Sequence, residues 1–216
     1  MMSRSLPTND LYDVISRRRD VRAEFTGAPL ADGVLNRLLG AAHAAPSVGL
    51  SQPWDFIIVR DGDTRQAFQE HVETERQAYG RTLDGERRRL YDGIKIEGIR
   101  ESTLGIVVTY HPGRGGPGVL GRNTIDDAGL YSVVAAIQNL WLAATAEGLG
   151  VGWVSFYREA FLQQLLDIPD GVRPVAWLCV GPVSVLHETP DLERRGWTHR
   201  RPLELAVHQE RWAGDR

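Results

Sequence analysis

The stretch from Ala128 to Tyr157, AGLYSVVAAIQNLWLAATAEGLGVGWVSFY, holds the most apolar segment of the chain and the three glycines that follow it. Apolar residues cover almost every face of 128–147 at helical spacing, which predicts a helix buried on all sides. Such a helix in a chain of 216 residues is either central in the domain or covered by a second subunit. Gly148, Gly150 and Gly152 follow a helix and open a strand, whereas a dinucleotide fingerprint follows a strand and opens a helix. They therefore predict a helix end and a strand whose backbone a flat ligand can approach closely.

Shorter elements are predicted on both sides of this stretch. Hydrophobic spacing and turn residues indicate helices from Leu11 into an arginine cluster, from about Asp32 to Pro46 and over 159–166, and strands over 55–60, 104–110 and 172–181. In the first helix Leu11, Val14 and Ile15 are expected to face a core. Residues 64–100 are polar and helical, which predicts a surface excursion or lid without the apolar density of a core element. No linker or repeat divides the chain, so residues 1–216 are expected to form a single domain of the α+β class.

Composition excludes several functions. The formal net charge of −3 provides no overall positive field, so no nucleic-acid or anionic-membrane partner is expected. The single cysteine, Cys179, excludes an internal disulfide and a cysteine-based zinc motif, and the six histidines form no HxxxH or HxH pair, so no metal is expected. A GxSxG elbow is missing as well. Without an apolar leader or a membrane-length stretch free of polar residues, the chain reads as a cytoplasmic protein.

The segment Arg17–Arg22, RRRDVR, is the strongest candidate for a ligand site. Four arginines in six residues repel one another at helical spacing, which favours an anionic partner such as a phosphate. Asp20 lies among these cations, and an ionised acid directed into a ligand site is a candidate for proton chemistry. The alternative is a solvated basic helix end in which Asp20 pairs with its neighbours.

Other donors are spread along the chain. Ser47 and Gln52 lie in the rigid loop PSVGLSQPW, Ser155 follows the glycine-rich strand, and Arg200 precedes Arg201 in the polar tail. Lys95 is the single lysine among 25 basic residues, which marks a position where a compact ammonium group is needed or where one lysine persists by chance. A phosphate joined to a flat, polar heterocycle would use all these groups.

Several of these segments carry a resemblance to a known family. RRRDVRAEF, AAHAAPSVGLSQPWDF, IKIEGIR, LYSVVAAIQNLWLAATAEGLGVGWVS, VAWLCVG and GWTHRRPLEL together resemble the flavin-dependent nitroreductase superfamily and, within it, the 5,6-dimethylbenzimidazole synthases of cobalamin biosynthesis. The resemblance extends from about Leu11 to Trp212. It implies a nitroreductase-like fold with a central mixed sheet surrounded by helices, and an intertwined homodimer that binds FMN in a groove between the subunits.

The resemblance also implies site residues and a reaction. The expected FMN contacts are Arg18, Arg19, Asp20, Val21, Arg22, Ser47, Lys95, Ser155 and Arg200. In the synthase family, reduced FMN is a substrate that reacts with dioxygen and is fragmented to 5,6-dimethylbenzimidazole and D-erythrose 4-phosphate. NAD(P)H then acts only indirectly, through a separate flavin reductase that supplies the reduced FMN.

The arginine motif distinguishes this chain from ordinary nitroreductases, whose motif resembles RRS where this one reads RRD. The hypothesis is that Asp20 acts as the acid/base group and that Ser155 orients the reacting molecule by a hydrogen bond. Two alternatives stay open: an NAD(P)H-dependent FMN nitroreductase or related oxidoreductase, and a flavin-binding carrier or sensor without catalysis.

Overall fold

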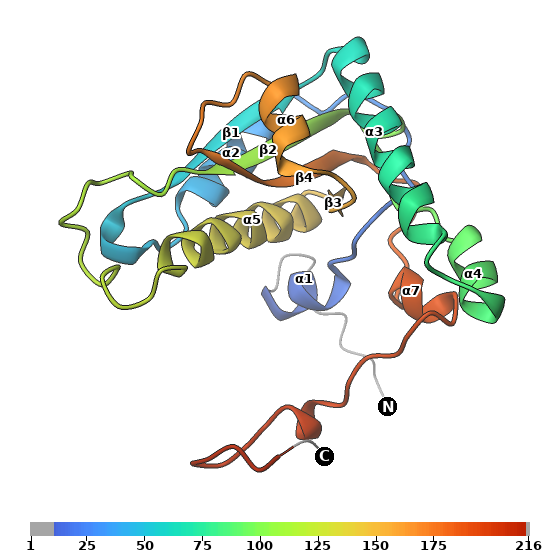
Figure 1. Cartoon of the computed structure of the whole chain (residues 1–216). Helices are drawn as coiled ribbons and strands as arrows, with labels where there is room; N and C mark the ends of the chain where they lie inside the picture. Colours follow the sequence, from blue (N-terminus) through green and yellow to red (C-terminus); the bar gives the residue numbers. More distant parts are fainter. Residues whose placement is uncertain (1–10, 215–216) are drawn as a thin grey trace, which may run out of the picture.

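The computed structural model describes residues 11–214 and contains a four-stranded sheet. The strands β1 (Trp54–Val59), β2 (Leu104–Tyr110), β3 (Leu149–Val154) and β4 (Arg173–Pro182) lie in the order β1-β2-β4-β3. All three pairings are antiparallel. The expected mixed character of the sheet is confined to one parallel bridge, between Asp20 and Val151. Helices cover the sheet on both faces, which confirms the α+β class (Figure 1).

The two faces of the sheet bury two separate cores because side chains alternate along each strand. Helices α2 (Val34–His43) and α5 (Ala128–Ala146) pack on the face that carries Ile106, Val108, Leu178 and Val180. Helices α3 (Gly62–Gly80) and α6 (Glu159–Leu165) cover the opposite face, which carries Val107, Trp177 and Cys179. Every residue of β2 is buried, as its continuous apolar run predicts for a strand covered on both sides.

Helix α5 follows the sequence prediction closely, and Gly148 ends it with a φ of 74°. It is not buried on all sides within one chain, because Tyr131 is 60% exposed and Val134 is 43% exposed. In the part of the chain that the structure describes, α5 is the one helix long and apolar enough to cross a membrane, and half of that stretch is buried inside the protein. Its packing against the sheet accounts for its composition.

Helix α1 (Leu11–Arg17) packs against α5 on the side of α5 that faces away from the sheet (Figure 1). Val14 is buried, as expected, but Leu11 and Ile15 are exposed, so the prediction that all three face a core is wrong for two of them. Together with Tyr131 and Val134 of α5, these side chains leave apolar surface uncovered on a single chain. Within residues 11–214, the outer faces of α1 and α5 therefore keep exposed apolar side chains.

The segment predicted as a polar excursion contains α3 and α4 (Gly85–Asp92). The expectation of a surface excursion is wrong for α3, because its Phe68 and Val72 are fully buried despite the low apolar density of the segment. Phe68 stacks on Trp177 of β4 with ring centroids 4.0 Å apart. The two apolar residues are four positions apart, so a helix that is polar elsewhere still buries one narrow stripe.

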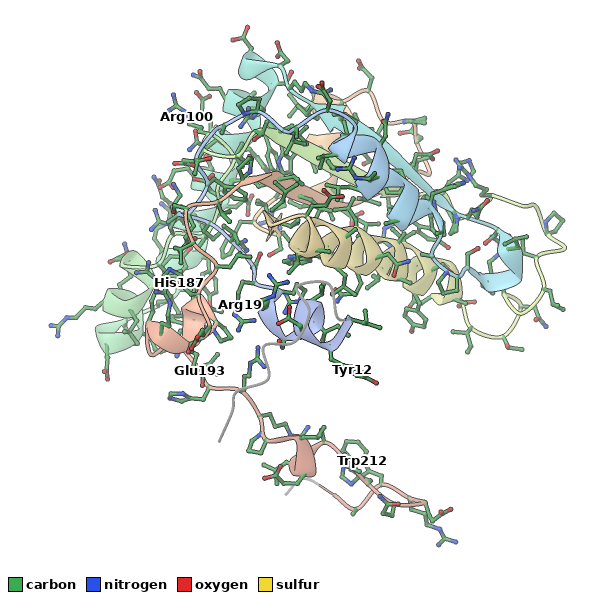
Figure 2. All side chains as sticks on the ribbon, turned by 180° about the vertical axis from the view of Figure 1, so that it is seen from behind. Tyr12, Arg19, Arg100, His187, Glu193 and Trp212 are labelled. Atoms are coloured by element: carbon green, nitrogen blue, oxygen red, sulfur yellow. The ribbon has the colours of Figure 1, made fainter. Side chains whose placement is uncertain are left out.

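The C-terminal segment after β4 carries the short helices α7 (Asp191–Arg194) and η2 (Leu203–Leu205). Helix α7 lies beside α4, and the residues after it extend away from the body of the protein (Figures 1 and 2). Trp212 is 71% exposed in this extension. Because the tail is polar but carries Trp197 and Trp212, its sequence predicts that it wraps over a surface, such as that of a partner subunit.

Candidate active site

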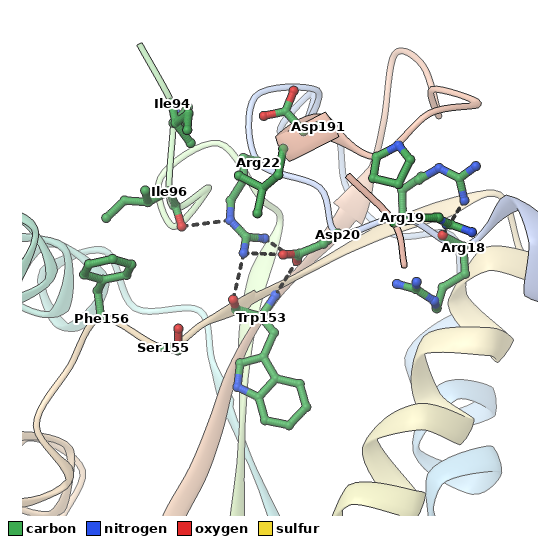
Figure 3. Close-up of a pocket in the computed structure, with 14 residues that line it drawn as sticks. Arg18, Arg19, Asp20, Arg22, Ile94, Ile96, Trp153, Ser155, Phe156 and Asp191 are labelled. Carbon is green, nitrogen blue, oxygen red and sulfur yellow. Dashed lines mark hydrogen bonds and ion pairs between the residues drawn. The ribbon is translucent and has the colours of Figure 1, made fainter. Parts of the chain in front are cut away.

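A cavity of about 400 Å³ lies where the loop after α1, the end of β3, the segment after α4 and helix α7 meet (Figure 3). Its walls bring together seven of the nine residues expected to contact a cofactor: Arg18, Arg19, Asp20, Arg22, Lys95, Ser155 and Arg200. Apolar side chains complete the walls, namely Ile94, Ile96, Trp153, Phe156, Pro190 and Leu192. The cavity therefore combines concentrated positive charge with surfaces that fit a flat ring.

The loop that carries Asp20 is fixed to β3 by backbone contacts. Val21 N donates to Val151 O at 3.0 Å, and the Val21 side chain is buried in the core beneath the cavity. A Cβ atom at Gly152 would lie 2.1 Å from Val21 O, so only glycine permits this approach. The prediction that a flat ligand approaches the strand backbone is wrong at Gly152, where the close neighbour is the chain's own loop.

The Asp20 carboxylate is held in one orientation. Both of its oxygens pair with the guanidinium group of Arg22, and Oδ1 also accepts a hydrogen bond from Trp153 N at 3.0 Å. Each carboxylate oxygen can accept two hydrogen bonds. Oδ1 therefore has both positions filled, whereas Oδ2, which accepts only from Arg22 among the described contacts, keeps one position for another donor.

The remaining arginines form a strongly positive corner. The Arg18 guanidinium lies over the Trp141 ring at 5.0 Å, and Trp141 Nε1 donates to Arg19 O at 3.0 Å, which holds the loop against α5. Burial lowers the pKa of Arg19 below its usual value, and the nearby charges of Arg200 and Arg18 lower it further. Arg19 Nε is buried with no hydrogen-bond partner. A bound anion would offset this repulsion and satisfy that donor.

Lys95 and Ser155 lie on other walls of the cavity. Lys95 Nζ forms an ion pair with Glu101, whose Oε2 atom is buried without a hydrogen-bond partner. Ser155 is exposed directly after β3, next to Phe156. Figure 3 shows Ser155 and Asp20 on the same side of the strand end that carries Trp153. The single lysine and the serine singled out in the sequence thus share one site with the arginine motif.

Two of the expected contact residues do not line this cavity. Val21 is buried below it. Ser47 lies at the other end of α5, where Val48 N donates to Ser132 Oγ at 3.1 Å and Ser47 Oγ accepts from Gln52 N at 3.0 Å. Ser132 precedes Trp141 by nine residues, which corresponds to about 14 Å along a helix. A single chain therefore does not bring Ser47 to the arginine corner.

The apolar walls of the cavity were not predicted from the sequence. Ile94 and Ile96 flank the single lysine, and Phe156 follows Ser155, so proximity to a predicted polar residue was the available signal. Asp191 and Leu192 reach the cavity from the C-terminal segment, far from the other residues in sequence. Nothing in the local pattern of that segment indicates its position.

The chain is similar to known proteins over most of its length. The model of the nitroreductase family matches residues 15–182. A 5,6-dimethylbenzimidazole synthase of Rhodospirillum rubrum is 43% identical over 86% of this chain and 87% of the relative. Another from Rhodobacter capsulatus is 36% identical over 90% and 93%, respectively.

Solved structures share the fold. Iodotyrosine deiodinase bound to FMN and 3-iodo-L-tyrosine superposes with a TM-score of 0.69 at 22% identity, covering 82% of this chain and 92% of that structure. B. megaterium NfrA2 superposes with a TM-score of 0.71 at 19% identity, covering 96% and 76%. At these identities the likeness establishes the architecture alone.

Proposed function

Because this chain belongs to the nitroreductase family, we propose that its cavity binds reduced FMN and that the chain is a 5,6-dimethylbenzimidazole synthase. The relatives with that name cover nearly the whole chain. The observation that carries the proposal is Asp20, a carboxylate fixed at the cavity wall inside an arginine motif. A carboxylate in that place is a poor ligand for an anionic cofactor and a suitable proton acceptor.

The cavity fits FMN by size and by the distribution of its charges. Its volume lies within the range of about 300–1,000 Å³ typical of cofactor and ligand sites. Arg18, Arg19 and Arg200 would bind the phosphate, for which the unpartnered Arg19 Nε is a ready donor. The apolar walls around Trp153 and Phe156 would contact the ring, and the ammonium group of Lys95 would stabilise the electron-rich reduced flavin.

In the proposed reaction, reduced FMN and dioxygen give 5,6-dimethylbenzimidazole, D-erythrose 4-phosphate and the remaining pyrimidine part of the flavin, a fragment of four carbons and two nitrogens that accounts for both oxygen atoms. Asp20 would accept a proton from the ribityl chain at Oδ2, the oxygen that keeps an open acceptor position. The Ser155 hydroxyl would hold the reacting part of the substrate by a hydrogen bond. Of the segment predicted as a lid, residues 94–96 line the cavity, and they would exclude water and other electron donors.

The second part of the proposal is a homodimer. The uncovered apolar side chains of α1 and α5 need a partner surface, and a second copy would cover them. Since Ser47 lies far from the arginine corner of its own chain, it would contact FMN in the site of the other subunit. A separate flavin reductase would supply the reduced FMN. That partner and the location in the cytoplasm remain predictions.

The test starts with FMN bound to the purified protein, reduced by light without oxygen and then exposed to air. Chromatography should detect 5,6-dimethylbenzimidazole together with loss of flavin absorbance. Return of all the oxidised FMN would contradict the proposal, and rapid oxidation of NAD(P)H with a nitroaromatic acceptor would then support the nitroreductase alternative.

A matched pair of variants tests the role of Asp20. Asp20→Asn should bind FMN and form no product, because the amide keeps the shape and loses the proton acceptor. Asp55→Asn is the control, since Asp55 also pairs with an arginine, Arg114 at 2.6 Å, but does not line the cavity. Product formation by Asp20→Asn at the wild-type level would refute the catalytic role.

A further inference from the structure

The loop that carries Ser155 joins β3 to α6 over residues 155–158. Its first two residues, Ser155 and Phe156, line the cavity (Figure 3). Its last two residues, Tyr157 and Arg158, contact helix α3 instead. Because the loop is so short, any contact that fixes its far end also limits where the Ser155 hydroxyl can lie.

One face of α3 packs against this loop. The members of that face recur every three or four positions, which places them on the same side of a helix: Phe68, His71, Glu75 and Tyr79. The ring centroids of Tyr79 and Phe156 are 5.8 Å apart. Those of Phe68 and Tyr157 are also 5.8 Å apart. Helix α3 therefore supports the loop of Ser155 as well as covering the sheet.

His71 is the member of this face that holds the loop backbone. Arg158 N donates to His71 Nε2 at 3.0 Å, and the imidazole ring stacks on Phe161 of α6 with centroids 3.9 Å apart. An imidazole nitrogen accepts a hydrogen bond only when it carries no proton, so this contact requires the neutral ring. The Arg158 guanidinium also pairs with Glu75 at 2.8 Å, but its side chain is 72% exposed, which makes that ion pair the weaker restraint.

We infer that His71 is a positioning residue of the active site, which holds the Ser155 hydroxyl and the Phe156 ring at the cavity wall. It acts through the backbone of Arg158 and does not itself line the cavity. This inference rests on the proposed function, because it matters for the reaction only if Ser155 orients the reacting molecule.

The groups around His71 favour the neutral ring. Burial lowers the pKa of His71, and the charge of Arg158 on the facing loop lowers it further, whereas Glu75 on the same helix raises it. Phe161, which faces the ring from α6, carries no charge. The hydrogen bond is therefore kept at neutral pH and is lost when the pH falls below the usual pKa range of histidine, since the protonated Nε2 becomes a donor directed at another donor.

Two substitutions separate the hydrogen bond from the packing of the ring. His71→Gln keeps an acceptor, because its amide oxygen reaches about the position of Nε2, and it does not titrate. At pH 7.5 its yield of dimethylbenzimidazole per bound reduced FMN should stay within about threefold of wild type. His71→Leu packs on Phe161 without an acceptor, so its yield should fall about tenfold to a hundredfold, as expected when a reacting group moves by up to about 1 Å. Wild-type yield in His71→Leu would overturn the inference.

The pH profile is a readout that a merely structural role would not change. All other titrating groups are the same in wild type and in His71→Gln, so the ratio of their yields isolates the titration of His71. Between pH 7.5 and pH 5, wild type should lose about threefold or more in yield relative to His71→Gln. Equal pH profiles of the two proteins would contradict the assigned role.

Leu38→Ala is the control for general stability. Leu38 is fully buried in α2, on the opposite face of the sheet, so its truncation should lower the melting temperature. Yield per bound FMN and its pH profile should stay at wild-type values. An equal loss of yield in Leu38→Ala and His71→Leu would mean that His71 acts only through general stability, which would overturn the inference.

A second measurement needs no product. In nuclear magnetic resonance spectra of the wild-type protein, the amide resonances of Ser155, Phe156 and Arg158 should shift at the pH at which the His71 ring gains its second proton. The same resonances should not show this transition in His71→Gln. Resonances of Ser155 and Phe156 that ignore the protonation of His71 would overturn the inference. If wild type forms no product while these resonances follow His71, the proposed function fails and the control of the loop by His71 stands.

Discussion

The contact between Gly152 and the loop of Asp20 gives a prediction whose size follows from geometry. In Gly152→Ala the new Cβ would lie 2.1 Å from Val21 O, while ordinary contacts begin at 3.4 Å. The loop must therefore retreat by more than 1 Å. Val21 O is a backbone atom, so a change of side-chain rotamer cannot relieve the clash. The hydrogen bond from Trp153 N to Asp20 Oδ1, 3.0 Å long, would then exceed the normal range.

Two quantities should change together. Overpacking of this kind costs about 1–3 kcal/mol of unfolding free energy. Displacement of Asp20 by about 1 Å should lower product yield per bound FMN about a hundredfold. Urea unfolding measures the first and the photoreduction assay measures the second.

A glycine in open space provides the control for this substitution. No atom lies within 4 Å of a Cβ built at Gly40 in the middle of α2, so Gly40→Ala should raise stability by about 0.5–1 kcal/mol without changing yield. Wild-type stability and yield in Gly152→Ala would refute the claim that the strand and the loop are in direct contact there.

Three further predictions concern the rest of the fold. Phe68→Ala should cost about 3–5 kcal/mol in urea unfolding, because Phe68 is fully buried against Trp177; a cost below about 1 kcal/mol would place α3 outside the core. Burial raises the pKa of Cys179 to about 12, so at pH 8 the thiol should react with a thiol reagent only after unfolding, and fast labelling of the native protein would contradict its buried position. Burial lowers the pKa of His71, so at a pH near or below the usual pKa of histidine the unfolded state binds more protons than the folded state. The free energy of unfolding should therefore fall as the pH drops from 7 to 5. His71→Asn should reduce this pH dependence, and an unchanged pH dependence would exclude His71 as its source.

Most of the architecture could be predicted because its signals are local. The apolar run of α5, the continuous apolar strand β2 and the glycine that ends α5 each act within a few residues. The arginine motif, in which four like charges in six residues need an anion or solvent, also lines the cavity of the structure. Such features depend on residues that are close together in the sequence, so they can be recognised without the structure.

The remaining features depend on distant contacts. The direction of the Arg22 side chain is set by carbonyls of Ile96 and Trp153, which are 74 and 131 residues away. The burial of Phe68 depends on its stacking against Trp177 of β4, and the exposure of Leu11 and Ile15 depends on how α1 packs against the rest of the chain. The sequence showed which residue types were available, and tertiary packing placed the Arg22 guanidinium group against Asp20 and left Arg19 Nε buried without a hydrogen-bond partner.

The loop of Asp20 also covers an edge of the sheet. β3 is the last strand in the order β1-β2-β4-β3, so one side of it has no strand partner. On that side Val151 O accepts from Val21 N, Trp153 N donates to Asp20, and Trp153 O accepts from Arg22. An uncovered edge strand is a template for pairing with other chains and for aggregation. Substitutions that release this loop would therefore lower solubility along with activity, and the residues that we assign to chemistry also protect the edge of the sheet against aggregation.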